Sequence, residues 1–182
     1  GRRVTTNDYS SADYYYVNKS SLPKVYGGFN TSLSWKGFDL SAIFAYSIGG
    51  YIYNRDVTMI LHNGSLEGRD WSTEILRRWT PDNRYTDVPA LSTTSNNWNS
   101  ASTRFLQNNS YMRLKNLTLS YNLPKQWISK LSLSSVQVYV QGDNLFTIHR
   151  NQGLDPEQGI TGITYYRYPA MRTISGGINV SF

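Results

Sequence analysis

Asp155 and Glu157 are the two residues of this chain whose types and spacing come nearest to a catalytic pair. Two carboxyl groups that face one substrate are what glycoside hydrolases use, one as the general acid and one as the base or nucleophile. Pro156 stands between them, in a segment where turn formation and backbone capping are the ordinary roles of carboxylates. We find no second pair of carboxylates that would converge, so the chain is not expected to be an enzyme.

Metal and cofactor chemistry has little support in the sequence. His62 and His149 are the only histidines and there is no cysteine. The two histidines lie far apart in the chain rather than in a zinc spacing such as H-E-x-x-H. Asp143-Asn144, at the end of a predicted strand, indicates turn chemistry rather than a calcium site, which takes about six oxygens. With no P-loop and no G-x-S-x-G motif, we expect no metal and no cofactor.

Aromatic side chains in the long loops give a more diffuse binding signal. Their rings could stack on a sugar or on a peptide. The alternative is that loops of this length use aromatic residues to build cores of their own. The candidates for substrate contact are Trp71, Trp79, Tyr85, Trp98, Tyr165 and Tyr166.

Composition narrows the class of protein. The chain has 182 residues, of which 16% are charged and 14% are aromatic. Its net charge is +6, but the basic residues are scattered along the sequence rather than gathered in a patch, which argues against nucleic-acid binding. No apolar run approaches the roughly 20 residues of a spanning helix. Low charge with many aromatic and small polar residues is typical of a β-barrel with a lipid-facing band and a polar interior. A soluble carbohydrate-binding β-sandwich is the alternative.

Alternation of apolar and polar residues predicts the strands that would position these groups. Two strands lie between Val25 and Gly50, joined by a tight turn at Lys36-Gly37. Others run from about Tyr111 to Asn122, from about Ser134 to Asn144 and from Arg172 to Phe182. A weaker strand is predicted at Asp13 to Val17. The fold class is therefore all-β and antiparallel, with five or six strands.

Each predicted strand has one apolar face. In the transmembrane interpretation this face meets lipid, and the residues expected there include Phe29, Leu33, Phe44, Leu117, Leu119, Val138, Ile178, Val180 and Phe182. Arg113 and Lys115 share the apolar parity of their strand, and we expect them at the level of the lipid headgroups. In a β-sandwich the same apolar face would point into the core.

The connections alternate between short and long. Residues 36–37 and 124–133 form short turns, the latter with one possible helical turn opened by Pro124, whereas residues 51–109 and 146–171 form long loops. This asymmetry is typical of outer-membrane barrels, whose extracellular loops are the long ones. Within the first loop, Asp70 is expected to cap a helix whose apolar stripe consists of Trp71, Ile75, Leu76 and Trp79 and which ends at Thr80-Pro81.

Five or six strands are fewer than the eight or more of bacterial barrels. We therefore expect residues 22–182 to be the C-terminal part of a larger barrel, and residues 1–21 to be a preceding strand or loop.

Several stretches in order along the chain resemble one family. They are residues 22–30 (LPKVYGGFN), 78–83 (RWTPDN), 111–124 (YMRLKNLTLSYNLP), 141–147 (QGDNLFT) and 153–157 (GLDPE), followed by the ending Tyr168-Pro169 to Phe182. The chain resembles the C-terminal end of the SusC/RagA-like, TonB-dependent outer-membrane transporters of Bacteroidetes. The resemblance covers nearly the whole chain from about Leu22.

The resemblance implies a 22-stranded barrel in the cell outer membrane, with an N-terminal plug and a segment that contacts TonB. It implies a SusD-like surface lipoprotein as a partner, and oligosaccharides or peptides as the imported substrates. The plug and the TonB-contacting segment are not among these 182 residues. The final aromatic residue, Phe182, resembles the signal read by the barrel-assembly machinery.

Overall fold

The computed structural model describes residues 5–6, 8–62, 64, 66–92, 97–151, 153, 155–157, 159–164 and 166–182. The chain divides into two compact units. The strand unit consists of residues 22–50, 108–159 and 168–182, and the loop unit of residues 1–21, 51–107 and 160–167. No helix formed by the described residues is long and apolar enough to cross a membrane.

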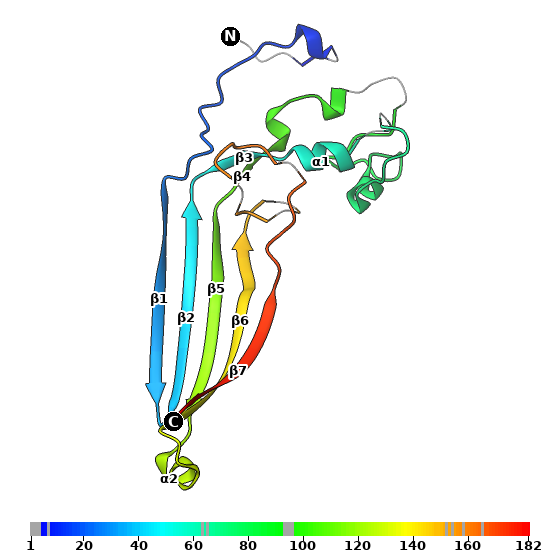
Figure 1. Cartoon of the computed structure of the whole chain (residues 1–182). Helices are drawn as coiled ribbons and strands as arrows, with labels where there is room; N and C mark the ends of the chain where they lie inside the picture. Colours follow the sequence, from blue (N-terminus) through cyan, green and yellow to red (C-terminus); the bar gives the residue numbers. More distant parts are fainter. Residues whose placement is uncertain are drawn as a thin grey trace. The chain divides into compact units, whose positions relative to one another are not determined.

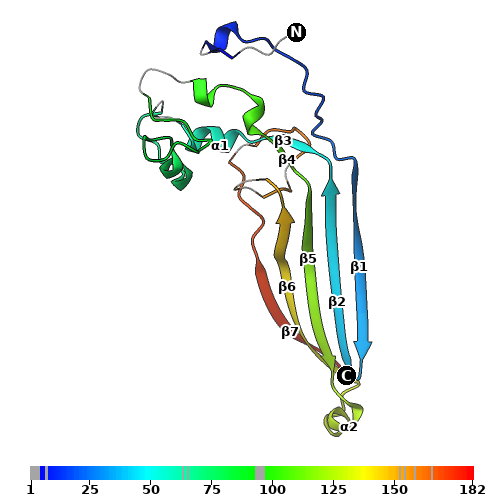
Figure 2. The same ribbon diagram turned by 180° about the vertical axis from the view of Figure 1, so that it is seen from behind.

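Five antiparallel strands form the single sheet of the strand unit, in the order β1-β2-β5-β6-β7 (Figures 1 and 2). Each strand pairs with the next strand of the unit along the chain, as in an up-and-down barrel wall. This confirms the predicted all-β antiparallel class. The strand unit has one sheet, whereas the alternative, a β-sandwich, would have two sheets packed face to face. The strands are β1 (Val25–Trp35), β2 (Phe38–Ile48), β5 (Tyr111–Asn122), β6 (Ser135–His149) and β7 (Thr173–Ser181).

The short turns form where the sequence predicts them. Trp35 pairs with Phe38 across the two-residue turn Lys36-Gly37, whose φ angles are 47° and 90°. Two positive φ angles match the right-handed twist of the flanking strands, and glycine adopts such an angle without steric cost. Helix α2 (Lys125–Ile128) follows Pro124, so proline opens one helical turn between β5 and β6.

The pairing register gives the sheet one apolar and one polar face. Phe29 pairs with Phe44, and their rings stack at 4.7 Å. Eight of the nine residues expected to face lipid lie on this face, and Phe182 follows the end of β7. Its exposed large side chains are Val25, Phe29, Leu33, Trp35, Phe38, Leu40, Ile48, Leu119, Val138, Val140, Phe146, Ile148, Ile174, Ile178 and Val180.

A β-bulge in the middle of the sheet reverses the parity of β5. Ile43 pairs with Asn116, but the next residue of β2, Phe44, pairs with Leu114, which leaves Lys115 as an extra residue. Leu114 therefore lies on the apolar face, although it is only two positions from the polar Asn116. Arg113 consequently falls on the polar face opposite Ala45. The prediction that Arg113 and Lys115 share the apolar face was wrong, because simple alternation does not survive a bulge.

The same irregularity lengthens β6. Leu114 of β5 pairs with Phe146 of β6, and Asn116 pairs with Asp143, so a step of two residues along β5 matches a step of three along β6. Within this step of β6, Asn144 adopts a φ of 52°. Beyond this bulge the strand continues to His149, five residues past the predicted end at Asn144. Pairing with the first residues of β5 supplies the backbone hydrogen bonds that extend it.

The loop unit contains two three-residue strands, β3 (Tyr51–Tyr53) and β4 (Leu106–Asn108, whose last residue belongs to the strand unit), and helix α1 (Arg55–Ile60). Asn54 caps α1 by accepting a hydrogen bond from the Val57 amide. A small core of Val57, Leu61 and Phe105 holds the unit together, with Tyr53 packed against it. The sequence did not predict α1, and residues Asp13 to Val17 do not form the predicted strand.

The helix predicted from Asp70 is shorter and of a different type. A 3-10 helix, η2, spans Thr73–Arg77 and is capped by Ser72. The Ser72 amide bonds the Ile60 carbonyl at 2.8 Å, which fixes the chain outside a helix until that point. At the other end, Asn83 and Thr86 both donate to the Arg77 carbonyl, which stops the helix before Thr80. The remaining short 3-10 helices are η1 (Tyr9–Ser11), η3 (Asn97–Asn99), η4 (Thr103–Phe105) and η5 (Ser129–Leu131).

Candidate functional site

The polar face of the strand unit carries rows of hydrogen-bonded side chains that cross the strands. Asn116 of β5 donates to Asp143 of β6 at 2.8 Å, and Thr118 donates to Asn116 at 2.9 Å. Farther along, Gln137 of β6 donates to Ser120 at 3.3 Å. Cross-strand polar pairs of this kind stabilise a sheet while leaving its surface wettable.

Arg113 is the centre of a charge cluster on this face. Its Nη1 donates to Glu157 Oε2 at 2.9 Å, its Nη2 pairs with Asp155 Oδ1, and its Nε donates to Thr147 Oγ1 at 2.9 Å. Lys115 Nζ lies 2.7 Å from Glu157 Oε1. We call Arg113, Lys115, Asp155 and Glu157 the charge cluster; it holds two positive and two negative charges.

Burial differs across the charge cluster. The side chains of Arg113 and Asp155 are 4% and 8% exposed, whereas those of Lys115 and Glu157 are 33% and 38% exposed. A buried charge is tolerated only when it is paired and hydrogen-bonded, so Arg113 depends on its partners more than Lys115 does. The cluster therefore has a dry side and a wet side.

The bulge at Lys115 explains how the cluster forms. It places Arg113 and Lys115 where they both reach Glu157, and the small residues Gly28 and Ala45 stand beside Arg113 in the same cross-strand row. Without the extra residue, alternation would place Arg113 on the other face. The local irregularity of β5 thus positions both cations.

The pKa of Asp155 lies below its ordinary value. Burial raises this pKa, but hydrogen bonds from the Ala170 amide, the Arg113 guanidinium and the Glu157 amide outweigh it. A general acid of a glycosidase needs a carboxyl group whose pKa is raised so that it keeps a proton. Asp155 is held ionised instead and is engaged in ion pairing, so its geometry is that of a structural anion rather than a catalytic acid.

Two short stretches of the chain after β6 are attached at the cluster. Asp155 Oδ2 accepts a hydrogen bond from the Ala170 amide at 2.7 Å. Asn109 Nδ2 donates to the Pro156 carbonyl at 2.8 Å, and Asn144 Nδ2 donates to the Met171 carbonyl at 3.2 Å. We call residues 155–157 and 168–171 the strap. An open cleft of about 480 Å³ beside the cluster is lined by Asn144, His149 and Arg172, among others.

The histidines have structural partners. His62 is buried, and its Nδ1 accepts hydrogen bonds from Trp71 Nε1 at 3.0 Å and from the Leu66 amide at 3.3 Å. The ring of His149 is paired through Nδ1 with the Asn151 carbonyl at 3.0 Å. Within the described part of the chain, no three His, Asp or Glu side chains gather as metal ligands.

The predicted substrate-contacting aromatics differ in burial. Trp98 is partly buried, with its Nε1 donating to the Leu61 carbonyl at 2.7 Å and the Arg104 guanidinium 3.3 Å from its ring centre. Trp71 and Trp79 are more exposed, and Tyr85 and Tyr166 project into solvent. Tyr165 lies outside the described residues. In the loop unit, these five described aromatics therefore include both packing residues and exposed rings.

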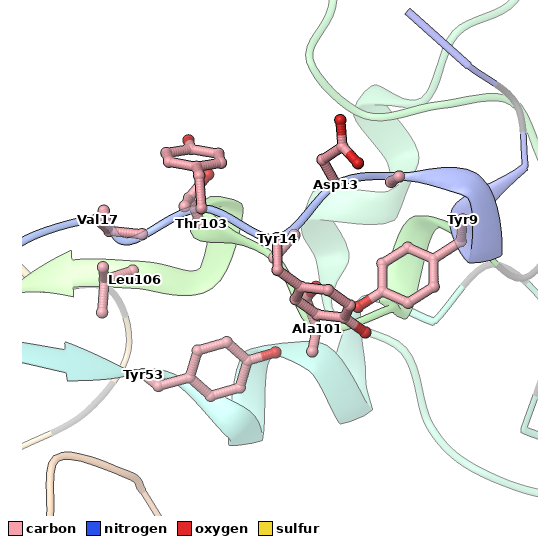
Figure 3. Close-up of a pocket in the computed structure, with 11 residues that line it drawn as sticks. Tyr9, Asp13, Tyr14, Val17, Tyr53, Ala101, Thr103 and Leu106 are labelled. Atoms are coloured by element: carbon pink, nitrogen blue, oxygen red, sulfur yellow. The ribbon is translucent and has the colours of Figure 1, made fainter.

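A pocket of about 440 Å³ in the loop unit is lined by tyrosines that the sequence reasoning did not select (Figure 3). The rings of Tyr9, Tyr14 and Tyr53 gather on one side of the chain, while the Asp13 carboxylate points to the other. Tyr9 Oη donates to the Ala101 carbonyl at 2.7 Å, which ties two distant segments together. The run Tyr14-Tyr15-Tyr16 was the available sequence signal. The lining is mostly aromatic and aliphatic, which suits an uncharged group.

Comparisons with known proteins agree with one another. No family model matches the sequence. Two TonB-dependent receptors of Formosa agariphila are 34% and 30% identical over 85% and 94% of this chain, and the TonB-dependent receptor SusC of Bacteroides thetaiotaomicron is 27% identical over 92%. The chain spans only 16–18% of the length of these relatives.

Solved structures of a peptide importer have the same fold. The RagAB peptide importer in its open-open state superimposes with a TM-score of 0.84 at 36% identity over 98% of this chain and 19% of the other. Its closed-closed state gives a TM-score of 0.82 at 35% identity, over 98% and 19% of the two chains. The five-stranded sheet and the loop unit are thus both represented in these structures.

Proposed function

Since the chain is a segment of a SusC/RagA-like TonB-dependent transporter, we propose that it forms part of the wall of an outer-membrane barrel that imports oligosaccharides or peptides. The observation that carries this proposal is the division of one continuous sheet into an apolar and a polar face. In a transmembrane barrel the first face contacts lipid and the second lines the lumen.

Energetics support lipid on the apolar face. Leaving a Leu, Ile or Phe side chain in water forgoes about 1.5–3 kcal/mol relative to covering it. Summed over the exposed side chains of this face, the stabilisation that lipid contact would add is comparable to or larger than the roughly 5–15 kcal/mol by which a typical domain is stable. Lipid-facing roles are therefore proposed for Phe29, Leu33, Phe44, Leu117, Leu119, Val138, Ile178, Val180 and Phe182.

The remaining assignments extend the same proposal. The connections 51–109 and 146–171 are extracellular loops, residues 1–21 are the preceding segment, and residues 22–182 belong to the barrel. The exposed loop aromatics and the tyrosine pocket are candidate contacts for uncharged parts of a substrate. Partners are the plug and remaining strands of the same transporter, a SusD-like lipoprotein over the barrel, and TonB acting on the part of the transporter that precedes this segment.

Uptake by the whole transporter tests the proposal. A strain that lacks the full-length gene is compared with the same strain complemented by it, using fluorescent oligosaccharides and peptides as separate probes. We expect complementation to restore the uptake of one class of probe, and this uptake to stop when a protonophore removes the proton gradient. We also expect the protein to fractionate with the outer membrane. Unchanged uptake in the deletion strain for both classes would refute the importer assignment.

A further inference from the structure

The strap lies over the polar face at the position of Arg113. Asp155 and Glu157 reach Arg113 and Lys115 of β5 across 42 to 44 positions of sequence. Arg113 is only 3% exposed in the folded chain. The neighbours of Arg113 in its cross-strand row include the small residues Gly28 and Ala45, so the strap contributes to covering its side chain.

Charge pairing is the strongest attachment of the strap. The strap also accepts single amide hydrogen bonds from Asn109, which precedes β5, and from Asn144 of β6. Hydrogen bonds in which a partner is charged are roughly twice as strong as those between neutral groups. Releasing the two carboxylates would therefore remove the ion pairs that join the strap to β5.

The wet side of the charge cluster offers a place where release can begin. Lys115 and Glu157 are one-third or more exposed, so water and dissolved ions reach this pair, while Arg113 and Asp155 stay dry. Ion pairs that water reaches are weak and are screened by salt, whereas buried pairs are screened much less. An opening that starts at Glu157 would meet a lower barrier than one that starts at Asp155.

We propose that the strap is a movable lid over this part of the polar face, latched shut by the charge cluster, and that it must swing away for substrate to pass. This proposal rests on the importer function, because it takes the polar face to be the wall of the conduit. Lids of this kind commonly move on the microsecond-to-millisecond timescale and limit turnover. The latch is the feature that would set how often the lid opens.

Covalent locking of the lid in the full-length transporter tests the proposal. The 182 residues contain no cysteine, so in a full-length transporter whose other cysteines have been replaced, Lys115→Cys and Glu157→Cys can be joined by a thiol-reactive bifunctional cross-linker with a reducible spacer. The matched control joins Thr118→Cys to Gln141→Cys, two residues that already pair between β5 and β6 on the same face. We expect locking of the first pair to lower uptake about tenfold and reduction to restore it, with no change for the control pair. Normal uptake by the locked transporter would overturn the lid.

Hydrogen exchange gives a second readout that does not depend on transport. In the purified full-length transporter, Arg113→Met should raise exchange of amides in the strap about tenfold or more, and by a larger factor than exchange of the strand amides of β6. Arg172→Met, which removes an exposed arginine near the same loop, is the control. Equal exchange in both variants would overturn the latch. Faster strap exchange in a transporter that imports neither class of probe would leave the latch standing and refute the importer function instead.

If Arg113→Met does not assemble, the milder variant Glu157→Gln replaces it. This change keeps the side-chain shape and removes only the charge at the exposed end of the cluster. Strap exchange should rise by a smaller factor than with Arg113→Met, since the buried Arg113–Asp155 pair remains. Unchanged strap exchange in this variant would count against release from the wet side.

Discussion

Arg113 Nη1 of β5 donates a 2.9 Å hydrogen bond to Glu157 Oε2, although 44 positions separate the two residues. The contact joins two of the stretches that resemble the SusC/RagA-like family, residues 111–124 and residues 153–157. Arg113 also pairs with the buried Asp155 of the same segment, and a strand and a loop that share a buried ion pair must fold together, because neither charge is stable in the interior without the other. The carboxylates that first suggested glycoside hydrolysis are thus part of the architecture.

Removing the buried cation should be strongly destabilising. Arg113→Met keeps the apolar stem but leaves Asp155 without its cation, and breaking one partner of a buried pair costs about 3–5 kcal/mol. We expect the midpoint of urea unfolding of the full-length transporter in detergent to fall accordingly. Lys115→Met, at the exposed end of the cluster, should lower the free energy of unfolding by less than about 1 kcal/mol and move the midpoint correspondingly little.

The double variant separates pairing from packing. Arg113→Met combined with Asp155→Asn removes both charges, so no unpaired ion remains, and a neutral replacement of a buried pair is often tolerated. Its midpoint should lie closer to wild type than that of Arg113→Met alone. A double variant at least as unstable as the sum of the single variants would contradict an ion-pair role for Arg113.

Acid should weaken the attachment of the strap. Because the pKa of Asp155 in the folded protein is lowered, its ionised form contributes stability that is present above the ordinary aspartate value of about 3.9 and is lost as the pH falls through the lowered value. Hydrogen exchange of the strap, measured from pH 7 down to pH 3 and corrected for intrinsic rates, should accelerate at the acidic end. Asp155→Asn should show a flatter profile, and parallel profiles for the two proteins would exclude Asp155 as the group responsible.

Strand positions and the apolar face were predictable because apolar and polar residues alternate along the sequence with the two-residue period of a strand. This alternation alone was enough to assign Phe29, Leu33, Leu119 and Val138 to the apolar face. The face of Arg113 was not predictable in this way, since a bulge shifts parity and Lys115 carries no residue-type signal for one.

Contacts at long range were equally hidden from sequence reasoning. The pairing of Arg113 with Asp155 spans 42 positions, and no local pattern specifies such a partner. The helix predicted from Asp70 failed for a similar reason, because the Ser72 amide and the Trp71 ring are held by Ile60 and His62 of a preceding segment. Tertiary contacts override local propensity in such short elements.

The bulge in β6 depends on the left-handed backbone of Asn144. Its φ of 52° favours Asn or Gly and is costly for a β-branched residue, by about 1–2 kcal/mol. Both Asn144→Gly and Asn144→Val lose the hydrogen bond to the Met171 carbonyl, but only valine adds backbone strain. We therefore expect the valine variant to unfold at lower urea than the glycine variant. Equal midpoints would show that the hydrogen bond, and not the backbone angle, matters at this position.

The two faces of the sheet can be tested at neighbouring positions of one strand. Leu119 and Thr118 are adjacent in β5 and point to opposite faces, so they share depth but not environment. An arginine placed on the lipid side near the bilayer midplane costs about 2–4 kcal/mol, whereas one in an aqueous lumen costs little. Leu119→Arg should therefore lower the amount of transporter assembled in the outer membrane and its resistance to urea, while Thr118→Arg should leave both close to wild type. If the two variants assembled equally well, or if Thr118→Arg were the more damaging, the apolar face would not be the one that meets lipid.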